Sequence, residues 1–374
     1  MIRLHVPCGR RPGEKRVPLV PEQIARFAEL GFAVAIERGA GVGAFYDDGD
    51  YASAGAELVG PENRARADVV LTLEGLPEEG EWKRGALLVG LLLEETDRER
   101  LAALAGRGVD TYALEYLPRV SRAQTMDVLS SQATCAGYHG AVLAASAHRA
   151  FFPMMTTAFG TLKPARVLVL GAGVSGLSAL AAVRRLGAEA WGYDVRRAAR
   201  EQVESLGARF LDLGIDASTP EGYARPLTAE ELRRQDDGLL ERLPQMDVVI
   251  TTALLSGRRA PVLLEERHVD VLPPGALVVD LAVDGGGNCR LSRPDETVVR
   301  GVRRILAPRR PAAGLARHAS TMLGRNFHAF LGLLVRDGKL GNVPEDPLLR
   351  ATALTLGGTI VHPAFASSAP GTPA

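Results

Sequence analysis

Short apolar runs alternate with stretches of helical spacing in the first third of the chain. The runs Phe32–Glu37, Asp68–Leu73 and Ala86–Leu91 are predicted strands, because each is brief and rich in apolar residues. Helices are predicted at Pro21–Leu30 and Thr96–Gly106, where apolar residues recur at helical spacing. Strands that alternate with helices are typical of a parallel sheet covered by helices.

A second stretch of the same kind begins near residue 166. Arg166–Leu170 and Glu189–Tyr193 are predicted strands. A predicted helix over Leu177–Leu186 lies between them and stops at Gly187. This strand–helix–strand order predicts a second parallel sheet.

Other segments extend these two patterns. Further strands are predicted at Asp247–Thr251 and Ala276–Val283. Ala123–Phe151 has helical character and would either bridge two domains or form an ordinary core helix. The polar segment Asp216–Asp237 is predicted to be a long loop, a kind of segment that is usually functional or disordered. The tail Ser367–Ala374 is predicted to be disordered.

Composition and charge narrow the classes of function. The length of 374 residues suggests two or three domains, and 44 Lys and Arg balance 44 Asp and Glu, so we expect no nucleic-acid partner. The three cysteines are far apart, which predicts neither a disulfide framework nor a metal site. No apolar run approaches the ~20 residues that span a bilayer, and the first residues lack the apolar core of a signal peptide. We therefore expect a cytoplasmic protein.

The sequence GAGVSG directly follows the predicted strand Arg166–Leu170 and opens the predicted helix. In such a turn Gly171 permits a tight bend, Gly173 lets the backbone approach a pyrophosphate, and Gly176 lets helix and strand pack closely. The free N–H groups at the helix start favour the negative charge of the pyrophosphate. This context predicts a dinucleotide site.

Asp194 ends the next predicted strand, 18 residues after Gly176. A carboxylate at this place accepts hydrogen bonds from the adenosine ribose and repels a 2′-phosphate, which favours NAD over NADP. Arg196 and Arg197 complicate this prediction, because an arginine there can hold a 2′-phosphate.

The stretch Pro118–Tyr138 reads PRVSRAQTMDVLSSQATCAGY and resembles the signature of the soluble NAD(H)-binding component of proton-translocating nicotinamide nucleotide transhydrogenases. Other segments are similar to the same family in the same order, so the resemblance covers nearly the whole chain. These segments are Arg10–Glu22, Phe152–Leu177, Glu201–Phe210, Thr251–Leu263, Val279–Cys289 and Gly357–Ala364. The chain resembles the separate alpha subunit of a multi-subunit form.

The resemblance implies an α/β fold of two Rossmann-like domains with parallel sheets and a cleft between them. It implies an alanine dehydrogenase/transhydrogenase-like domain at 1–130 plus 305–374, and an NAD-binding Rossmann domain at 131–304. It also implies a homodimer that binds NAD(H), passes hydride to NADP on a beta subunit, and lies at the inner face of the cell membrane through a membrane-embedded subunit.

Four residues of the signature are carried over as the catalytic set at the nicotinamide end: Arg119, Gln124, Asp127 and Ser130. Direct hydride transfer between two nicotinamides needs alignment and no general acid or base, which suits a set without histidine. Tyr223 belongs to Gly222–Arg225, which is similar to the tip of the family's mobile loop. The predicted cofactor-binding residues are Gly171, Gly173, Val174, Gly176, Asp194, Arg196, Tyr138, Tyr223, Ala253 and Leu254.

Three alternatives remain open at this point. Alanine dehydrogenase resembles the same fold, and Arg16 could match its substrate arginine, but Glu74 and a leucine (Leu92 or Leu93) stand where its lysine and histidine would be. A non-catalytic NAD-binding subunit is the second alternative. A repurposed paralogue is the third, because Thr72 and the segment at 306–311 depart from the family pattern.

Overall fold

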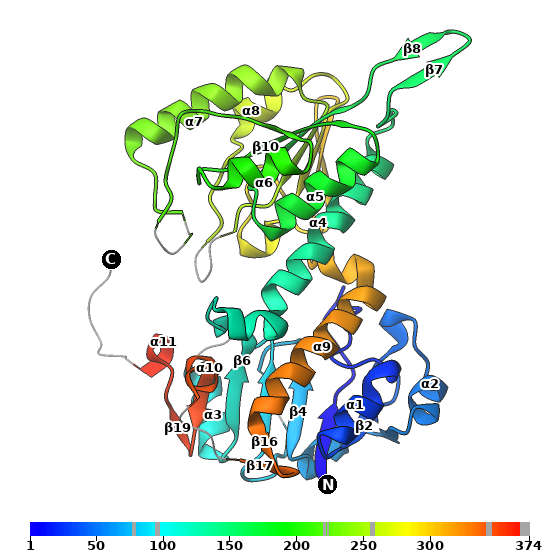
Figure 1. The fold of residues 1–374 in the computed structure, drawn as a ribbon, viewed down its shortest axis with the longest axis vertical. Helices are drawn as coiled ribbons and strands as arrows, with labels where there is room; N and C mark the ends of the chain where they lie inside the picture. The colour runs from blue at the N-terminus through cyan, green and yellow to red at the C-terminus, as the bar shows by residue number, and fades with distance from the viewer. Residues whose placement is uncertain are drawn as a thin grey trace. The chain divides into compact units, whose positions relative to one another are not determined.

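The computed structural model divides into two compact units, Met1–Gln132 with Ala316–Ala374, and Ala133–Leu315 (Figure 1). It describes residues 1–76, 80–93, 98–219, 222, 224–254, 259–341 and 346–366, and each unit is described by itself. Tyr223 and the tail Ser367–Ala374 lie outside these residues.

The first unit is built on an eight-stranded sheet with the order β19-β18-β6-β5-β4-β1-β2-β3. Strands β1 to β6 run parallel, whereas β18 pairs antiparallel with β6 and with β19. The strands are β1 (Ile2–Val6), β2 (Phe32–Glu37), β3 (Glu57–Val59), β4 (Val69–Thr72), β5 (Leu87–Gly90), β6 (Asp110–Ala113), β18 (Ala353–Leu356) and β19 (Thr359–Ile360).

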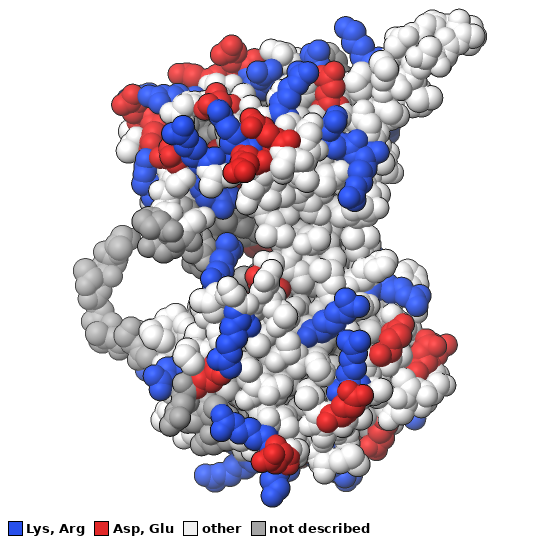
Figure 2. Space-filling view, in the orientation of Figure 1, with Lys and Arg blue, Asp and Glu red and all other residues white. Residues whose placement is uncertain are grey.

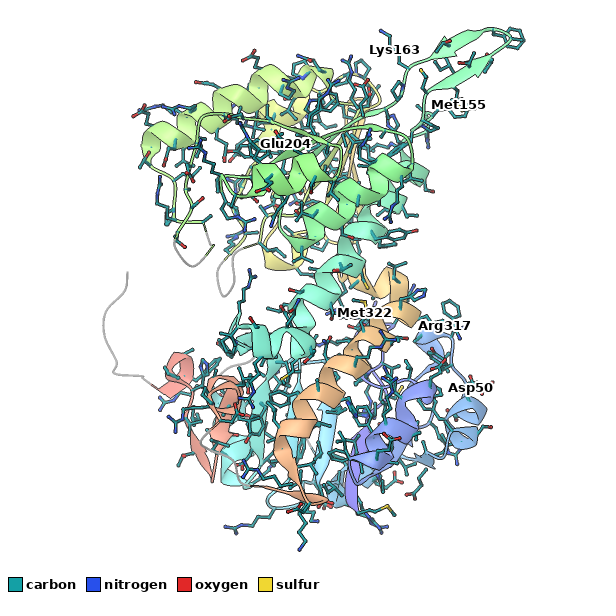
Figure 3. All side chains as sticks on the ribbon, in the orientation of Figure 1. Asp50, Met155, Lys163, Glu204, Arg317 and Met322 are labelled. Atoms are coloured by element: carbon teal, nitrogen blue, oxygen red, sulfur yellow. The ribbon has the colours of Figure 1, made fainter. Side chains whose placement is uncertain are left out.

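The helices of this unit bury their apolar faces against the sheet. They are α1 (Ile24–Glu29), α2 (Asp48–Ser53), α3 (Arg98–Gly106), α9 (Ala316–Leu334), α10 (Pro347–Thr352) and α11 (Pro363–Ala366), with 3-10 turns at η1 (Pro21–Gln23), η2 (Val42–Ala44), η3 (Pro61–Arg66), η4 (Leu114–Tyr116) and η5 (Ser121–Met126). The long helix α9 buries Phe327 and Phe330 and leads into the small hairpin β16 (Val335–Arg336) and β17 (Lys339–Leu340). Arg317, labelled on α9 in Figure 3, lies over the Tyr46 ring at 4.9 Å from its centroid.

The second unit is built on a seven-stranded sheet with the order β11-β10-β9-β12-β13-β15-β14. All its pairs are parallel except that of β14 with β15. The strands are β9 (Arg166–Leu170), β10 (Glu189–Tyr193), β11 (Arg209–Phe210), β12 (Val248–Thr251), β13 (Leu277–Asp280), β14 (Thr297–Arg300) and β15 (Arg303–Leu306). The two mainly parallel sheets confirm the predicted α/β class.

The strand order places a topological switch point between β9 and β12. The chain runs from β9 outward to β10 and β11, then returns to β12 on the other side of β9. Open sheets of this kind bind ligands in the crevice at the carboxyl ends of the two strands that flank the switch point. The ends of β9 and β12 are therefore where a ligand site is expected.

The helices of the second unit correct one prediction. They are α5 (Val174–Arg185), α6 (Ala199–Ser205), α7 (Ala229–Arg242) and α8 (Glu266–Asp270), with short turns at η6 (Leu243–Gln245), η7 (Val283–Gly285) and η8 (Pro311–Leu315). The predicted loop over Asp216–Asp237 is wrong from Ala229 onward, where α7 begins. The Thr228 hydroxyl and the Glu231 carboxylate cap this helix reciprocally, so it forms despite its polarity.

The chain passes between the units through α4 (Val128–Ala147), which the 3-10 turn η5 precedes. This helix is shorter than the predicted Ala123–Phe151. A hairpin of β7 (Met155–Thr157) and β8 (Gly160–Leu162) follows and projects from the second unit (Figure 1). Its strands and turn carry no charged residue (Figure 2), and Phe159 at its tip is fully exposed.

Candidate functional site

The glycine turn after β9 has the backbone geometry that its sequence predicts. Gly171 has a φ of 98°, and a Cβ added there would lie 2.9 Å from Thr252 Oγ1. A Cβ on Gly176 would lie 1.8 Å from the Gly171 carbonyl oxygen. A Cβ on Gly173 would meet nothing within 4 Å, so the chain leaves open space beside this backbone.

The start of α5 suits a bound phosphate. Gly173 is the N-cap residue and provides no side-chain cap, and Val174 at the first position is partly exposed. The first N–H groups of a helix have no partner inside the helix, and the helix dipole favours an anion in front of them. The open space at Gly173 lies at this end of α5, so the turn fits a pyrophosphate.

Asp194 follows β10 and is held by several donors. The Ala172 N–H donates to Asp194 Oδ2 at 2.8 Å, while Arg196 donates its N–H and its Nε–H to Oδ1 and its Nη2–H to Oδ2, each at 2.9 Å. This hydrogen bonding raises the pKa of Arg196. Arg196 Nη1 also donates to the Gly222 carbonyl at 3.2 Å. The charge of Arg196 is therefore paired internally.

The end of β12 lies directly against the glycine turn. Thr252 Oγ1 donates to the Gly171 carbonyl at 2.8 Å, and the Ala253 nitrogen lies 3.0 Å from the place of a Cβ on Gly171. The Leu254 side chain that follows is 58% exposed. The structure thus brings Ala253 and Leu254 to the same switch point as the glycines, although they lie far away in sequence.

Helix α4 also reaches this turn. A Cβ on Gly137 would lie 1.9 Å from the Ser175 carbonyl oxygen, and Ser178 Oγ donates to the Thr134 carbonyl at 2.8 Å. Tyr138, next to Gly137, is 46% exposed. The predicted support residue therefore lies on a helix that packs closely against the start of α5.

In the first unit, the transhydrogenase-like signature forms η5 and the first turn of α4. The Asp127 carboxylate accepts the Ser130 N–H at 2.9 Å and the Ser130 hydroxyl at 2.6 Å, which caps the helix. Gln124 and Arg119 are exposed. The structure therefore pairs Asp127 with Ser130 and leaves the Gln124 side chain accessible.

Helix α9 anchors this signature through a buried amide that the sequence analysis did not single out. Asn326 donates to the Thr125 carbonyl and accepts the Ser131 hydroxyl, both at 2.8 Å. Gln132 donates to the Ala319 carbonyl at 3.2 Å. Only the fold brings α9 to these residues, and an isolated asparagine in a helix gave no signal of this role.

Arg16 is enclosed by its own neighbours. Its Nε and Nη2 donate to the two oxygens of Glu14 at 2.8 and 2.7 Å, and its Nη1 donates to Gln132 Oε1 at 2.9 Å. The side chains of Arg16 and Glu14 are only 8% and 2% exposed. Burial alone would raise the pKa of Glu14, but the hydrogen bonds from Arg16 outweigh it and lower that pKa. The charge of Arg16 is already neutralised.

The other positions around this arginine also lack acid–base groups. The Glu74 carboxylate accepts the Arg10 and Arg11 N–H groups, each at 2.7 Å. Leu92 is completely buried and Leu93 partly so. Among the described residues, no group of three or more His, Cys, Asp or Glu could hold a metal ion. Within the same ranges, no helix has the length and apolar character needed to cross a membrane.

Comparisons with known proteins agree along the whole chain. Residues 5–136 match the family model for the alanine dehydrogenase/PNT N-terminal domain, and residues 140–363 match that for its C-terminal domain. The chain is 42% identical over 379 residues to the first of the polypeptides that form the NAD(P) transhydrogenase alpha subunit of Rhodospirillum rubrum, covering 97% of this chain and 99% of that protein.

One solved structure and one further relative extend this comparison. The transhydrogenase of Sinorhizobium meliloti superposes with a TM-score of 0.88 at 37% identity, covering 96% of this chain and 100% of that one. Alanine dehydrogenase of Mycobacterium tuberculosis is 29% identical over 306 residues, covering 78% of this chain and 76% of that protein.

Proposed function

The chain belongs to the alanine dehydrogenase/PNT family, and we propose that it is the NAD(H)-binding alpha subunit of a proton-translocating transhydrogenase. In this role it binds NADH and presents it to NADP⁺ on a beta subunit. The two units correspond to the two domains of the family. The proposal includes a homodimer that is held at the cytoplasmic face of the membrane by a membrane-embedded subunit.

The observation that carries this proposal is the closed pair of Arg16 and Glu14. An enzyme that aminates a keto acid must bind a carboxylate and move a proton at the amine, which needs a free cation and a positioned acid or base. Here the guanidinium of Arg16 is neutralised by Glu14, and Glu74 is engaged by backbone N–H groups. Hydride transfer between nicotinamides requires neither group. This favours the transhydrogenase over alanine dehydrogenase.

The second unit supplies the cofactor site of the proposal. The N–H groups at the start of α5 would hold the pyrophosphate, and the open space at Gly173 admits it. The ribose hydroxyls would replace the side-chain donors of Arg196 at Asp194. Because the guanidinium of Arg196 is paired with Asp194, it has little attraction left for a 2′-phosphate, and this supports NAD over NADP.

The first unit supplies the positioning groups at the reacting end. When bound, NADH supplies the hydride. Gln124 is exposed and uncharged and offers both a donor and an acceptor, so it suits a bridge to the second nucleotide. Asp127 and Ser130 hold the adjacent helix start in one conformation, and Arg119 contributes positive charge beside them. Their task is alignment, on which the rate of hydride transfer depends steeply.

The test is hydride transfer with a purified partner. The chain is mixed with NADH, NADP⁺ and the NADP(H)-binding beta subunit encoded beside a family member, and nicotinamide absorbance or fluorescence is followed by stopped flow. We expect fast transfer in the mixture and negligible turnover of the chain alone with NADH, pyruvate and ammonia. Alanine formation by the chain alone would contradict the proposal, as would failure to transfer hydride despite tight NADH binding.

A further inference from the structure

The loop after β13 is organised around a carboxylate that no water reaches. Asp280 ends this strand and is 0% exposed. Its carboxylate accepts five hydrogen bonds of 2.7–3.0 Å from this loop and from the end of β12. The donors are Thr251 Oγ1, Ala282 N, Asn288 N, Cys289 N and Ser292 Oγ. A carboxylate satisfied by this many donors fixes the loop backbone around it.

One outcome of this arrangement is the fixed position of Asn288, which is also 0% exposed. Its Oδ1 accepts the Ala253 N–H at 2.9 Å, and its Nδ2 donates to the carbonyls of Ala253 at 2.8 Å and of Pro261 at 2.7 Å. Both amide hydrogens are therefore used. A single side chain holds the peptide groups on both sides of Ala253 and the backbone at Pro261.

The segment that Asn288 holds faces the switch point of the sheet. Ala253 lies against the Gly171 turn, and the exposed Leu254 follows it. A dinucleotide at such a switch point has one half over each side of the sheet. Asp194 follows β10 and takes the adenosine side, so the segment after β12 faces the other half.

We propose that Asn288 is the positioning residue for the nicotinamide half of the dinucleotide. This inference rests on the proposed function, because it assumes that the ligand is NAD(H). Asn288 acts through the Ala253 backbone and does not touch the ligand itself. It sets the height of the Ala253–Leu254 segment beside the Gly171 turn, and with it the surface against which the second half of the ligand packs.

The three hydrogen bonds explain why an amide is needed here. A carboxylate at this position keeps an acceptor for the Ala253 N–H but faces two carbonyl oxygens without a proton to donate. An alanine leaves one N–H and two carbonyls of the buried backbone without this partner. Either change releases the segment, and each unmade buried hydrogen bond costs enough to shift the equilibrium by about 10-fold.

The test compares two probes that differ only beyond the pyrophosphate. Asn288→Ala and Asn288→Asp are titrated with NADH and with ADP, which has the adenosine and pyrophosphate but no nicotinamide half. We expect NADH affinity to fall about 10-fold or more and ADP affinity to stay within about two-fold. Gln235→Ala is the control. It removes another buried amide of the same unit, which accepts the Tyr193 hydroxyl at 3.0 Å, and should leave the ratio of the two affinities unchanged.

The pH profile adds a readout that a loss of stability would not produce. In Asn288→Asp, lowering the pH from 8 to 5.5 should restore some of the NADH affinity, because the protonated carboxyl regains one donor. Parallel loss of NADH and ADP affinity, unchanged affinity for both, or unfolding of both variants would overturn the proposal. If the unaltered chain bound neither probe, the proposed function itself would fail, which separates the two conclusions.

Discussion

Two glycines of one turn should fail in different ways when each is replaced by alanine. Gly176 and Gly173 are three residues apart, but a Cβ on Gly176 would lie 1.8 Å from the Gly171 carbonyl oxygen, whereas a Cβ on Gly173 would meet nothing within 4 Å. Ordinary van der Waals contact begins at 3.4 Å. Gly176→Ala therefore forces the helix away from the strand, whereas Gly173→Ala leaves the fold of the turn unchanged.

The magnitude follows from the atom that is struck. The Gly171 oxygen is backbone and cannot rotate away, so we expect Gly176→Ala to cost about 3 kcal/mol, the upper end of overpacking penalties. For a unit of this size that corresponds to a fall in Tm of about 6–12 °C. Gly173 has a φ of −78°, which alanine adopts without strain, so Gly173→Ala should cost less than about 1 kcal/mol of stability.

Binding should separate the pair in the opposite sense. Calorimetric unfolding gives Tm, and titration with NADH and ADP gives affinity. Gly173→Ala should keep its Tm but lose at least about 10-fold in affinity for both nucleotides, because a methyl group fills the space of the pyrophosphate. If Gly173→Ala binds NADH normally, the pyrophosphate does not lie there. If Gly176→Ala is as stable as the unaltered chain, the close packing of helix on strand is not what this glycine provides.

Three further changes test other regions of the molecule. Asp194→Ala should weaken NADH binding by about 10-fold and reduce the preference over NADPH, because it frees the guanidinium of Arg196; equal binding of both nucleotides by the unaltered chain would refute this. Gln124→Asn should leave NADH affinity within a few-fold but slow hydride transfer to the partner by about 10-fold in stopped flow, and an unchanged rate would contradict the assigned role. Burial, with Arg64 nearby, lowers the pKa of His5 to about 4, below its value when unfolded, so stability is full above about pH 6.5 and falls by about 3 kcal/mol toward pH 4. His5→Leu should lose less stability between pH 7.5 and 4.5 in urea unfolding, and an equal loss would show that His5 is not responsible.

The strands that were predicted correctly share one property, a continuous apolar run with polar or glycine residues at its ends. Phe32–Glu37, Arg166–Leu170 and Glu189–Tyr193 match β2, β9 and β10 residue for residue. Strand β1 was missed because Arg3 and His5 interrupt its pattern, although His5 is buried. A strand in the middle of a sheet covered on both faces has no requirement to alternate, so its polar members hide it.

The glycine turn could be predicted because its signal is local. Gly171, Gly173 and Gly176 are constrained by a bend and by contacts within a few residues, and these constraints are visible in the sequence itself. Asn288 and Asn326 act on backbone that is 35 and 201 residues away. An amide can serve as donor and acceptor for any nearby peptide group, so nothing in its own neighbourhood announces the partner. Such residues become recognisable only when the fold has brought the segments together.

The buried polar residues of this chain have a common use that fits the proposed chemistry. Asn326 fixes the segment that carries Gln124, and Asn288 fixes the segment that carries Ala253. Both bind peptide groups. An enzyme that moves protons spends such residues on a base and its orienting partner. Hydride transfer between two rings instead depends on how accurately each ring is held, and that accuracy comes from backbone whose own hydrogen bonds are satisfied on every side.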